Sequence, residues 1–516
     1  MNAGLYRKIR FAVGGGVLGF STLAFADIGD WIPAQIARVG LWPQFTPSLL
    51  GIAHGAGWIA AGCVAVLLLT LLFGRVYCAM LCPLGVLMDL SAWLARRTGK
   101  KRKLPYRPGR TWLRVGAVGI CAAGLLAGSA VPLGLLDPYS VFGKITSATL
   151  RPLLGWANHW ISSATGLFHP VDVSPLAWTT AGVAIGLFVL VVASAVLRGR
   201  LWCNTVCPVG AVLGMFSKHA WLRLKIADNA CVGCSLCERV CPAQCIDFRN
   251  RSIDHSRCVM CLDCVTSCKR SGITLQKHGK TAATPVPAAS TGRHAKFTID
   301  RRLFLASAVT IPSAVLGAED TGPQNATRHH KRAVLPPGAK SLAHFQRSCT
   351  GCQLCVTNCP DQVLRPSITA HGLAGFLQPY QDFTVAFCSY NCSNCSQVCP
   401  TGAIQPLTIT ERRAVRTGSV RFFQDLCVVE TKGTSCGACN EHCPTQAIRM
   451  VPWKNHLTIP EIDEDLCVGC GGCEFICPVR PNRAIIVDGL PVHERAKVLP
   501  LGQKNTIREI EEEFPF

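Results

Sequence analysis

The chain has 516 residues, 31 cysteines and a formal net charge of +22, and its mean hydropathy of +0.29 is high for a water-soluble protein. This length predicts several domains. Disulfide frameworks of such cysteine density belong to short secreted chains, so the composition favours iron–sulfur or zinc sites. Because the excess Lys and Arg residues lie beside apolar segments, they favour loops flanking membrane helices over a nucleic-acid partner.

Four apolar segments in the first half predict membrane-spanning helices, at residues 11–28, 49–73, 115–136 and 176–197. The last three reach the roughly 20 residues that a bilayer core requires. The first is shorter and contains "AFA" near its end, which resembles a signal-peptidase site, so it is a helix or a cleaved signal. Lys and Arg cluster before the first segment and between the second and third. The N-terminus and residues 74–114 are therefore expected in the cytoplasm, and the loop at 137–175 outside.

Two closely similar sequences follow the second and fourth segments. They read GRVYCAMLCPLGVLMD at residues 74–89 and GRLWCNTVCPVGAVLG at residues 199–214, which predicts two copies of one helix pair. The repeat is expected to gather four thiols at the cytoplasmic membrane surface, namely Cys78, Cys82, Cys203 and Cys207. Four thiolates there are candidates to hold a metal or a cluster, or to form redox-active disulfides. Structural thiols in tight turns are the alternative.

Other residues of the predicted spans suggest lesser roles. Cys63 and Cys121 lie inside apolar segments and are expected to be small buried residues. His54 is an ionisable residue at membrane depth, so a quinone or haem contact is one hypothesis and a helix-packing hydrogen bond is the other. Tyr139, at the expected outer surface, is a candidate border of a quinol pocket.

Two cysteine runs downstream have the spacing of bacterial ferredoxins. They read CVGCSLCERVCP from residue 231 and CVMCLDCVTSCK from residue 258, with Lys269 where the first run has proline. In this motif three cysteines of a run ligate one cubane and the fourth ligates the neighbouring cubane. The expected ligand sets for two [4Fe–4S] clusters are Cys231, Cys234, Cys237 and Cys268, and Cys258, Cys261, Cys264 and Cys241. Cys245 is expected to fill a small packing position.

A polar segment at 276–297 reads as a linker, and a twin-arginine segment follows it. Arg301 and Arg302 precede the uncharged residues 303–318, so residues 298–320 predict an export signal in the middle of the chain. Because the twin-arginine pathway accepts folded cargo, a domain that must first receive its clusters in the cytoplasm can use it. Residues 303–318 are expected to stay as a fifth span or to be cleaved.

Four more cysteine runs follow a second linker at 321–340. The middle two have insertions between their first and second cysteines. The sixteen cysteines are Cys349, Cys352, Cys355, Cys359, Cys388, Cys392, Cys395, Cys399, Cys427, Cys436, Cys439, Cys443, Cys467, Cys470, Cys473 and Cys477. With the eight before them they supply 24 ligands, enough for six [4Fe–4S] clusters. The first and last runs are expected to pair around the middle two, and sequential pairing remains open.

These elements predict a membrane α-helical bundle of four to five helices joined to two α+β ferredoxin-like polyferredoxin domains. The expected divisions are 1–215 (membrane domain), 216–275 (two clusters, cytoplasmic), 276–297 (linker), 298–320 (signal or anchor), 321–340 (linker), 341–500 (four clusters) and 501–516 (tail). The chain has no P-loop, and its G-x-G-x-x-G match at residues 14–19 lies within the first apolar segment and does not follow a predicted strand, so a nucleotide or flavin site has no support. The acidic tail reads as a solvated helix or a dock for a basic partner.

With these motifs in place, residues 1–275 resemble the NapH/MauN family of membrane quinol dehydrogenase subunits. Residues 298–500 resemble the NapG/MauM family, through the twin-arginine segment and the four runs with loosened middle spacings. Lys269 and the fusion itself depart from the pattern. The resemblance implies electron transfer from the membrane quinol pool to a periplasmic acceptor, of the nitrate reductase or methylamine-oxidising kind. It also implies a bacterial inner-membrane location, with residues 321–516 in the periplasm.

A second hypothesis belongs to another functional class. The C-x3-C-P repeat also occurs in NosR-like and copper-reductase-like membrane ferredoxins, so the protein is alternatively an electron donor for the maturation or assembly of another metalloenzyme. A membrane anchor whose outer domain only docks partners is a third hypothesis, which six cluster sites disfavour.

Overall fold

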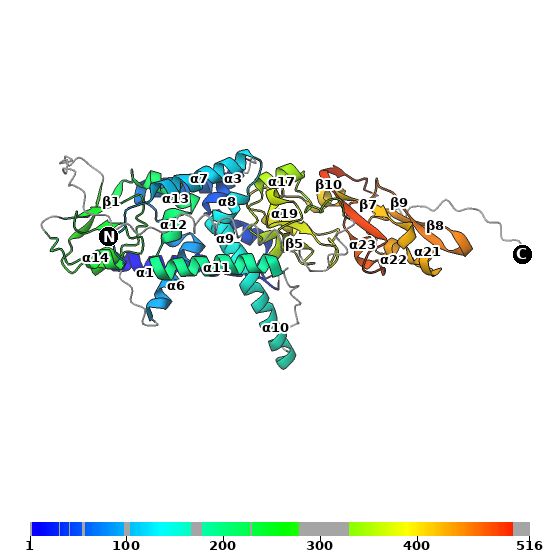
Figure 1. Cartoon of the computed structure of the whole chain (residues 1–516), viewed down its shortest axis with the longest axis horizontal. Helices are drawn as coiled ribbons and strands as arrows, with labels where there is room; N and C mark the ends of the chain where they lie inside the picture. The colour runs from blue at the N-terminus through cyan, green and yellow to red at the C-terminus, as the bar shows by residue number, and fades with distance from the viewer. Residues whose placement is uncertain are drawn as a thin grey trace, which may run out of the picture.

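Helices of the first half form a bundle along the long axis of the molecule (Figure 1). The computed structural model describes residues 3–29, 31–40, 42–53, 57–97, 104–166, 178–227, 230–277 and 330–498. The helices are α1 (Ala3–Ala26), α2 (Ala34–Val39), α3 (Phe45–Ala53), α4 (Gly57–Phe73), α5 (Tyr77–Met80), α6 (Pro83–Arg97), α7 (Thr111–Leu126), α8 (Val131–Leu136), α9 (Pro138–Ile145), η1 (Thr146–Leu150), α10 (Arg151–Thr165), α11 (Trp178–Arg198), α12 (Leu201–Thr205) and α13 (Pro208–Ser217).

The expectation of four to five spanning helices is not met in the described part of the chain. Two helices there, α1 and α11, are long and apolar enough to cross a membrane by length and composition. The apolar segment 115–136 divides into α7 and α8. Gly128 has a left-handed φ of +84°, which favours a helix end, and Pro132 sits in the first turn of the next helix. In the segment 49–73 the described residues belong to α3 and α4, and residues 54–56 lie outside the described ranges.

Residues 138–165 are helical, although the sequence suggested an outward loop between residues 137 and 175. The Asp137 side chain caps α9 by accepting a hydrogen bond of 2.8 Å from the Ser140 amide, which favours a helix start there. The helix continues through the π-helical turn η1 into α10. In Figure 1, α10 leaves the bundle crosswise to α11, and its Trp156 and Trp160 side chains are exposed.

The inner ferredoxin unit follows α13 and comprises β1 (Leu222–Ile226), α14 (Leu236–Val240), β2 (Ile246–Asp247), β3 (Ser252–Ile253), α15 (Asp263–Ser267) and β4 (Ile273–Lys277). Strands β1 and β4 pair antiparallel, with Leu224 opposite Leu275, and β2 pairs with β3. Each cysteine run therefore lies between one strand of the outer pair and one strand of the hairpin. Such short two-stranded sheets supply little apolar core of their own.

The outer ferredoxin region holds two units in sequence. The first comprises α17 (Leu342–Ser348), α18 (Leu354–Thr357), β5 (Leu364–Ser367), η3 (Leu373–Gly375), β6 (Gln378–Gln381) and α19 (Asn394–Val398). After α20 (Ile409–Ala414), the second comprises β7 (Val415–Phe422), η4 (Gln424–Leu426), α21 (Val428–Lys432), α22 (Ala438–Glu441), β8 (Ile448–Pro452), η5 (Lys454–His456), β9 (Thr458–Ile462), α23 (Gly472–Ile476) and β10 (Ile485–Arg495). Strands β7 and β10 enclose the β8–β9 hairpin, which repeats the layout of the inner unit.

The inner unit and the outer units lie at opposite ends of the bundle (Figure 1). Helix α1 reaches both ends. Near its start, Tyr6 donates a hydrogen bond of 2.8 Å to the Met260 carbonyl oxygen and Arg10 lies 3.4 Å from the Asp263 carboxylate. Near its end, α1 contacts α18 of the first outer unit. A helix of 24 residues is about 36 Å long at 1.5 Å per residue, so the two ends are separated by roughly the thickness of a bilayer.

Several expectations concern residues outside the described ranges. These are the candidate His54, the twin-arginine segment 298–320, most of the linker 276–297 and the acidic tail 501–516.

Candidate iron–sulfur sites

The loops that carry the closely spaced cysteine runs share one backbone conformation. The residues on both sides of the second cysteine have positive φ, namely Gly233 and Ser235, Met260 and Leu262, Gly351 and Gln353, and Gly469 and Gly471. Turns of this kind direct successive backbone N–H groups into a concavity that binds anionic groups, including iron–sulfur clusters. In the two runs with insertions the corresponding residues Ser393 and Gly437 have negative φ, so the insertions change how the chain enters the loop.

The inner unit brings together the crossed cysteine sets expected from its spacing. Cys241, Cys258, Cys261 and Cys264 line one hollow with about 310 Å³ of empty space. In the other set, burial raises the pKa of Cys237, and the neighbouring Cys231 and Cys234 raise it further. The Cys268 sulfur accepts a hydrogen bond of 3.2 Å from the Gly272 amide, and Gly272 packs against the Ala230–Cys231 peptide.

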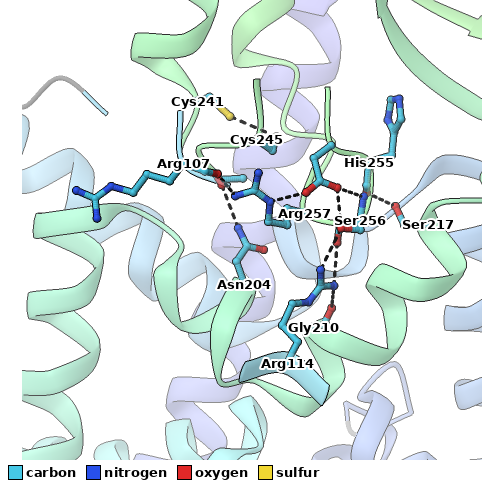
Figure 2. A network of polar contacts seen from close by, with 12 residues as sticks. Arg107, Arg114, Asn204, Gly210, Ser217, Cys241, Cys245, His255, Ser256 and Arg257 are labelled. Carbon is cyan, nitrogen blue, oxygen red and sulfur yellow. Dashed lines mark hydrogen bonds and ion pairs between the residues drawn. The ribbon is translucent and has the colours of Figure 1, made fainter. Parts of the chain in front are cut away.

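Cys245 was expected to be a packing residue, and it is fully buried. Its sulfur lies 3.6 Å from the Cys241 sulfur and its side chain lines the same hollow as the four grouped cysteines (Figure 2). The small residues at the corresponding positions of the other runs predicted that Cys245 is buried. They did not predict its contact with the Cys241 sulfur.

The outer cysteines group sequentially, so the expected pairing of the first run with the last is wrong. Burial raises the pKa of Cys355, and the next contributions come from Cys349, Cys352 and Cys399. Burial likewise raises the pKa of Cys395, and the nearby Cys388, Cys359 and Cys392 raise it further. Each set therefore contains three cysteines of one run and the fourth cysteine of the other, so the first run pairs with the second.

The third and fourth runs form the other outer pair. Cys427, Cys436, Cys439 and Cys477 line a second hollow with about 370 Å³ of empty space. Burial raises the pKa of Cys473, and its neighbours Cys470, Cys467 and Cys443 raise it further. The strand order gives the reason, because β7 precedes the third run and its partner β10 follows the fourth, which closes these two runs into one unit.

The donor chemistry of these six sets suits [4Fe–4S] clusters. Backbone amides donate hydrogen bonds to ligand sulfurs in several of them, as Ala447 does to Cys443 at 3.2 Å and Ile404 does to Cys399 at 3.3 Å. Such bonds are among the features that set cluster potentials. In the described parts of the chain, no group of three or more His, Cys, Asp or Glu side chains is arranged to hold a single metal ion.

A network of polar contacts docks the inner unit on the bundle (Figure 2). Arg114 of α7 donates hydrogen bonds to the hydroxyl and the carbonyl oxygen of Ser256, at 3.0 and 3.1 Å. Asn204 donates a bond of 3.2 Å to the Ala243 carbonyl oxygen, and the Ser217 hydroxyl donates one of 2.8 Å to the His255 carbonyl oxygen. These contacts hold the chain on either side of the β2–β3 hairpin, next to Cys241 and Cys258.

The first outer unit docks on α8 to α10 at the opposite end. Lys144, with a side chain 2% exposed, donates hydrogen bonds to the carbonyl oxygens of Gly134 and Thr350, at 2.9 and 3.0 Å. The Ser140 hydroxyl donates to the Thr350 hydroxyl at 2.9 Å. A Cβ atom on Gly143 would lie 2.3 Å from the Cys352 carbonyl oxygen, so only glycine permits this approach. Sequence reasoning did not identify Lys144 as a functional candidate.

The four cysteines of the repeated motif are gathered, as the repeat predicted, and they are buried inside the bundle. Cys78, Cys82, Cys203 and Cys207 are each at most 4% exposed. Burial raises the pKa of Cys203 to about 11, while the neighbouring Arg200 lowers it and Cys78 raises it. Burial also raises the pKa of Cys207, and Cys203, Cys78 and Cys82 are all among its charged neighbours. The four thiols are therefore mutual neighbours.

Tyr139, a candidate border of a quinol pocket, is buried at the end of the bundle that the first outer unit covers. Its side chain is 4% exposed and its ring lies 5.3 Å from the Phe25 ring, centroid to centroid. Burial raises the pKa of Tyr139, and the next contribution comes from Cys352. Because the outer unit covers it, Tyr139 lies between α1 and the first outer cysteine set.

Comparison with protein families supports the iron–sulfur assignment. A family described as a 4Fe-4S binding domain matches residues 56–101 and 180–227, the two copies of the internal repeat. Families described as 4Fe-4S dicluster domains match residues 348–404 and 432–480. The chain contains ferredoxin-type 4Fe-4S domains. The two dicluster matches also agree with sequential pairing of the outer runs.

Curated relatives are ferredoxin-type proteins as well. The chain is 34% identical over 156 residues to the methylamine utilization ferredoxin-type protein MauM of Methylobacillus flagellatus, covering 28% of this chain and 63% of that protein. It is 29% identical over 167 residues to the ferredoxin-type protein NapF of Escherichia coli, covering 32% and 91%. It is 29% identical over 233 residues to the methylamine utilization protein MauN of Paracoccus denitrificans, covering 44% and 62%. The matches to MauM and MauN thus span less than two thirds of those proteins.

Proposed function

We propose that the protein is a membrane-bound polyferredoxin that transfers electrons from the quinol pool to a redox partner in the periplasm. One observation carries the proposal: cysteine sets suited to iron–sulfur clusters occupy both ends of a helical bundle with an apolar outer surface (Figure 1). A soluble ferredoxin has no need of such a surface between its cluster sites.

The exposed side chains of the bundle support a membrane location. Val115, Ile120 and Val189 are 66%, 60% and 58% exposed, and large exposed apolar areas mark protein or membrane contacts. Tryptophans gather at membrane interfaces. Among the tryptophans whose side chains the structure describes, eight are exposed, and all eight precede residue 222, mostly near helix ends. They are Trp31, Trp42, Trp93, Trp112, Trp156, Trp160, Trp178 and Trp221.

The chain's own residues have a defined task in this function. When bound, [4Fe–4S] clusters supply one-electron transfer over a wide range of potentials. The cysteines would hold them, and the positive-φ turns would direct amides toward them, while the docking contacts of Ser256 and Thr350 fix the inner and outer sets against the bundle. The twin-arginine segment between the sets would account for their placement on opposite sides of a membrane.

The nature of the partners is inferred from the relatives. The similarity to MauM, MauN and NapF favours an acceptor of the kind served by methylamine-oxidising or nitrate-reducing systems. Quinol is the proposed donor because the first half resembles quinol dehydrogenase subunits. The enzymatic activity would then be that of a quinol dehydrogenase and electron-transfer subunit.

The test is the location of the C-terminus. A C-terminal tag on the full chain is expected to be digested by protease added to intact spheroplasts, and only in cells with a functional twin-arginine pathway. A cytoplasmic tag on the same protein's N-terminus is the protected control. A protected C-terminal tag would contradict the proposal and would favour a cytoplasmic-face reductase for the maturation of another metalloenzyme.

A further inference from the structure

We propose that Cys78, Cys82, Cys203 and Cys207 hold a seventh [4Fe–4S] cluster inside the helical bundle. Binding of this cluster is independent of the proposed function, whereas its role as the link between inner and outer clusters rests on that function. The first support is that the four cysteines, from two copies of one motif, are all buried in the same core cluster.

The two copies build the site reciprocally. Arg75 of the first copy donates a hydrogen bond of 3.0 Å to the Cys203 carbonyl oxygen of the second copy. Arg200, at the same place in the second copy, donates to the Cys78 carbonyl oxygen of the first. Each arginine therefore crosses to the other copy, so neither copy completes the site alone.

In each copy, the residue two positions after the proline must be glycine, because the backbone and the arginine from the other copy leave no room for a side chain there. A Cβ atom on Gly85 would lie 2.4 Å from the Cys78 carbonyl oxygen and 3.2 Å from an Arg200 nitrogen. A Cβ atom on Gly210 would lie 2.1 Å from the Cys203 carbonyl oxygen and 2.7 Å from an Arg75 nitrogen. The motif G-R-x-[YW]-C-x3-C-P-x-G thus encodes one close-packed pseudo-twofold arrangement.

The sulfurs have the environment of cluster ligands. The Gly85 amide donates to the Cys82 sulfur at 3.4 Å, and the Gly210 amide donates to the Cys207 sulfur at 3.3 Å. The ferredoxin units place the same type of bond on cysteines that also precede proline, as Ala447 does on Cys443 at 3.2 Å. The bundle cysteines therefore share two features with these ferredoxin ligands: each precedes a proline, and each accepts a hydrogen bond from a nearby backbone amide.

The site contains a buried positive charge, on Arg75, that an anionic group would stabilise. The Arg75 side chain has no exposed surface, and the described residues place no carboxylate within ion-pairing distance of it. One of its nitrogens lies 3.8 Å from the Cys78 sulfur, and its Nε has no hydrogen-bond partner. Arg75 donates hydrogen bonds to the Asn204 side chain at 2.9 Å and to two carbonyl oxygens, but these partners carry no negative charge. A buried charge without an opposite charge is unfavourable. Four cysteinates with a [4Fe–4S]²⁺ core carry a net charge of −2, of which Arg75 would offset one unit, because Arg200 is already paired with Asp89 at 2.6 Å.

The site lies between the two ferredoxin regions. Arg75 also donates a hydrogen bond of 3.1 Å to the Ser256 carbonyl oxygen, two residues before Cys258 of the inner unit. On the outer side, burial raises the pKa of Tyr77, and Cys82 and then Asp137 are its next charged neighbours. Asp137 caps α9, which carries Lys144 against the first outer unit. In transfer through the site, one electron enters and one leaves, and no bond or proton changes place. The quinol is the ultimate reductant, and the outer clusters are the oxidant.

The experiment counts iron and acid-labile sulfide in the full-length protein, purified without oxygen in detergent. The expected content is about 28 iron atoms per chain, four for each of seven clusters. Substitution of Cys78→Ser with Cys203→Ser is expected to remove about four of them and to leave the ferredoxin signals in the electron paramagnetic resonance spectrum unchanged. The matched control carries Cys63→Ser with Cys121→Ser, two buried bundle cysteines outside the motif, and should keep all the iron.

A content of about 24 iron atoms in the unsubstituted protein, four for each of six clusters, would overturn the seventh cluster. So would a disulfide among the four cysteines found by alkylation before and after reduction. If the doubly substituted protein fails to fold, two other measurements test for the cluster. They are the iron content of the unsubstituted protein and the electron paramagnetic resonance spectrum of an Arg75→Gln variant. An altered signal in that variant supports the cluster, and an unaltered spectrum opposes it. Loss of four irons without loss of quinol-dependent reduction of the outer clusters would uphold the site and reject only its linking role.

Discussion

Lys144 is a buried cation placed against one particular cysteine set. Its ammonium group bonds to the carbonyl oxygen of Thr350, which lies between Cys349 and Cys352 in the chain. Burial lowers the pKa of Lys144 to about 8, and Cys352 and Cys349 act in the opposite direction. A positive charge here stabilises the reduced form of a nearby cluster, because reduction adds negative charge. Lys144 is therefore expected to make the first outer cluster easier to reduce.

Replacement of Lys144 by methionine should lower the reduction potential of that cluster by tens of millivolts. One charge at an effective dielectric constant of about 20 contributes on the order of 1 kcal/mol over such distances. Lys144→Arg is the control that keeps the charge. The measurement is a redox titration followed by electron paramagnetic resonance, in which the signals of the other clusters should keep their potentials. Equal potentials in the methionine and arginine variants would show that the lysine only docks the domain.

Helix α10 is amphipathic and leaves the bundle sideways. Leu153, Trp156 and Trp160 are each about 60% exposed or more, and the two indole rings lie 5.9 Å apart. In Figure 1 the helix runs crosswise to α11, which is one of the two long apolar helices. A helix in this direction would lie flat on a membrane that α11 crosses. Interfacial helices of this kind bury Trp and Leu at the boundary between lipid headgroups and acyl chains.

Tryptophan fluorescence in lipid nanodiscs tests this placement of α10. Lipids with brominated acyl chains should quench part of the fluorescence, and Trp156→Ala with Trp160→Ala should remove a share of the quenchable signal. Trp453→Phe in the last ferredoxin unit is the control, since its indole bonds to Glu430 far from the bundle, and that change should remove unquenched signal only. If iodide in the water quenches the α10 tryptophans and brominated lipid does not, the helix is not interfacial.

The sequence predicted the elements with a fixed local spacing and missed those set by tertiary contacts. The inner crossed sets follow from C-x2-C-x2-C-x3-C spacing, because adjacent turns hold those cysteines. The pairing of the outer cysteine runs does not follow from their spacing, because it depends on strand β7 pairing with strand β10, some 60 residues later in the chain. The broken spans depend on single residues such as Gly128, which hydropathy does not weigh. The repeat revealed the grouping of Cys78 with Cys203, but the exchange of Arg75 and Arg200 between copies required the fold.

At the scale of the whole molecule, one buried core runs through the chain. It includes Phe25 and Tyr139 in the bundle, Cys261 of the inner unit and Cys473 of the last outer unit. Electron tunnelling weakens steeply with distance. The part of α1 from Arg10, which bonds to the Cys261 carbonyl oxygen, to Phe25, which packs on Tyr139 near the first outer unit, is about 22 Å long. Transfer from one end to the other therefore needs a redox centre in between, and the four bundle cysteines are the group of thiols in the described bundle that lies there.

Transfer across the whole molecule should be measurable in sealed liposomes that contain the full-length protein and enclose cytochrome c. Dithionite added outside does not cross the lipid, so trapped cytochrome c is expected to be reduced only where the protein conducts electrons across the membrane. Cys78→Ser with Cys203→Ser should reduce the rate to that of protein-free liposomes, because the middle centre is lost. Cys63→Ser with Cys121→Ser should retain the rate, which separates loss of the centre from general damage to the bundle. If unsubstituted protein with a full iron content leaves the trapped cytochrome oxidised, the inner and outer clusters serve separate partners and the molecule is not a single conductor.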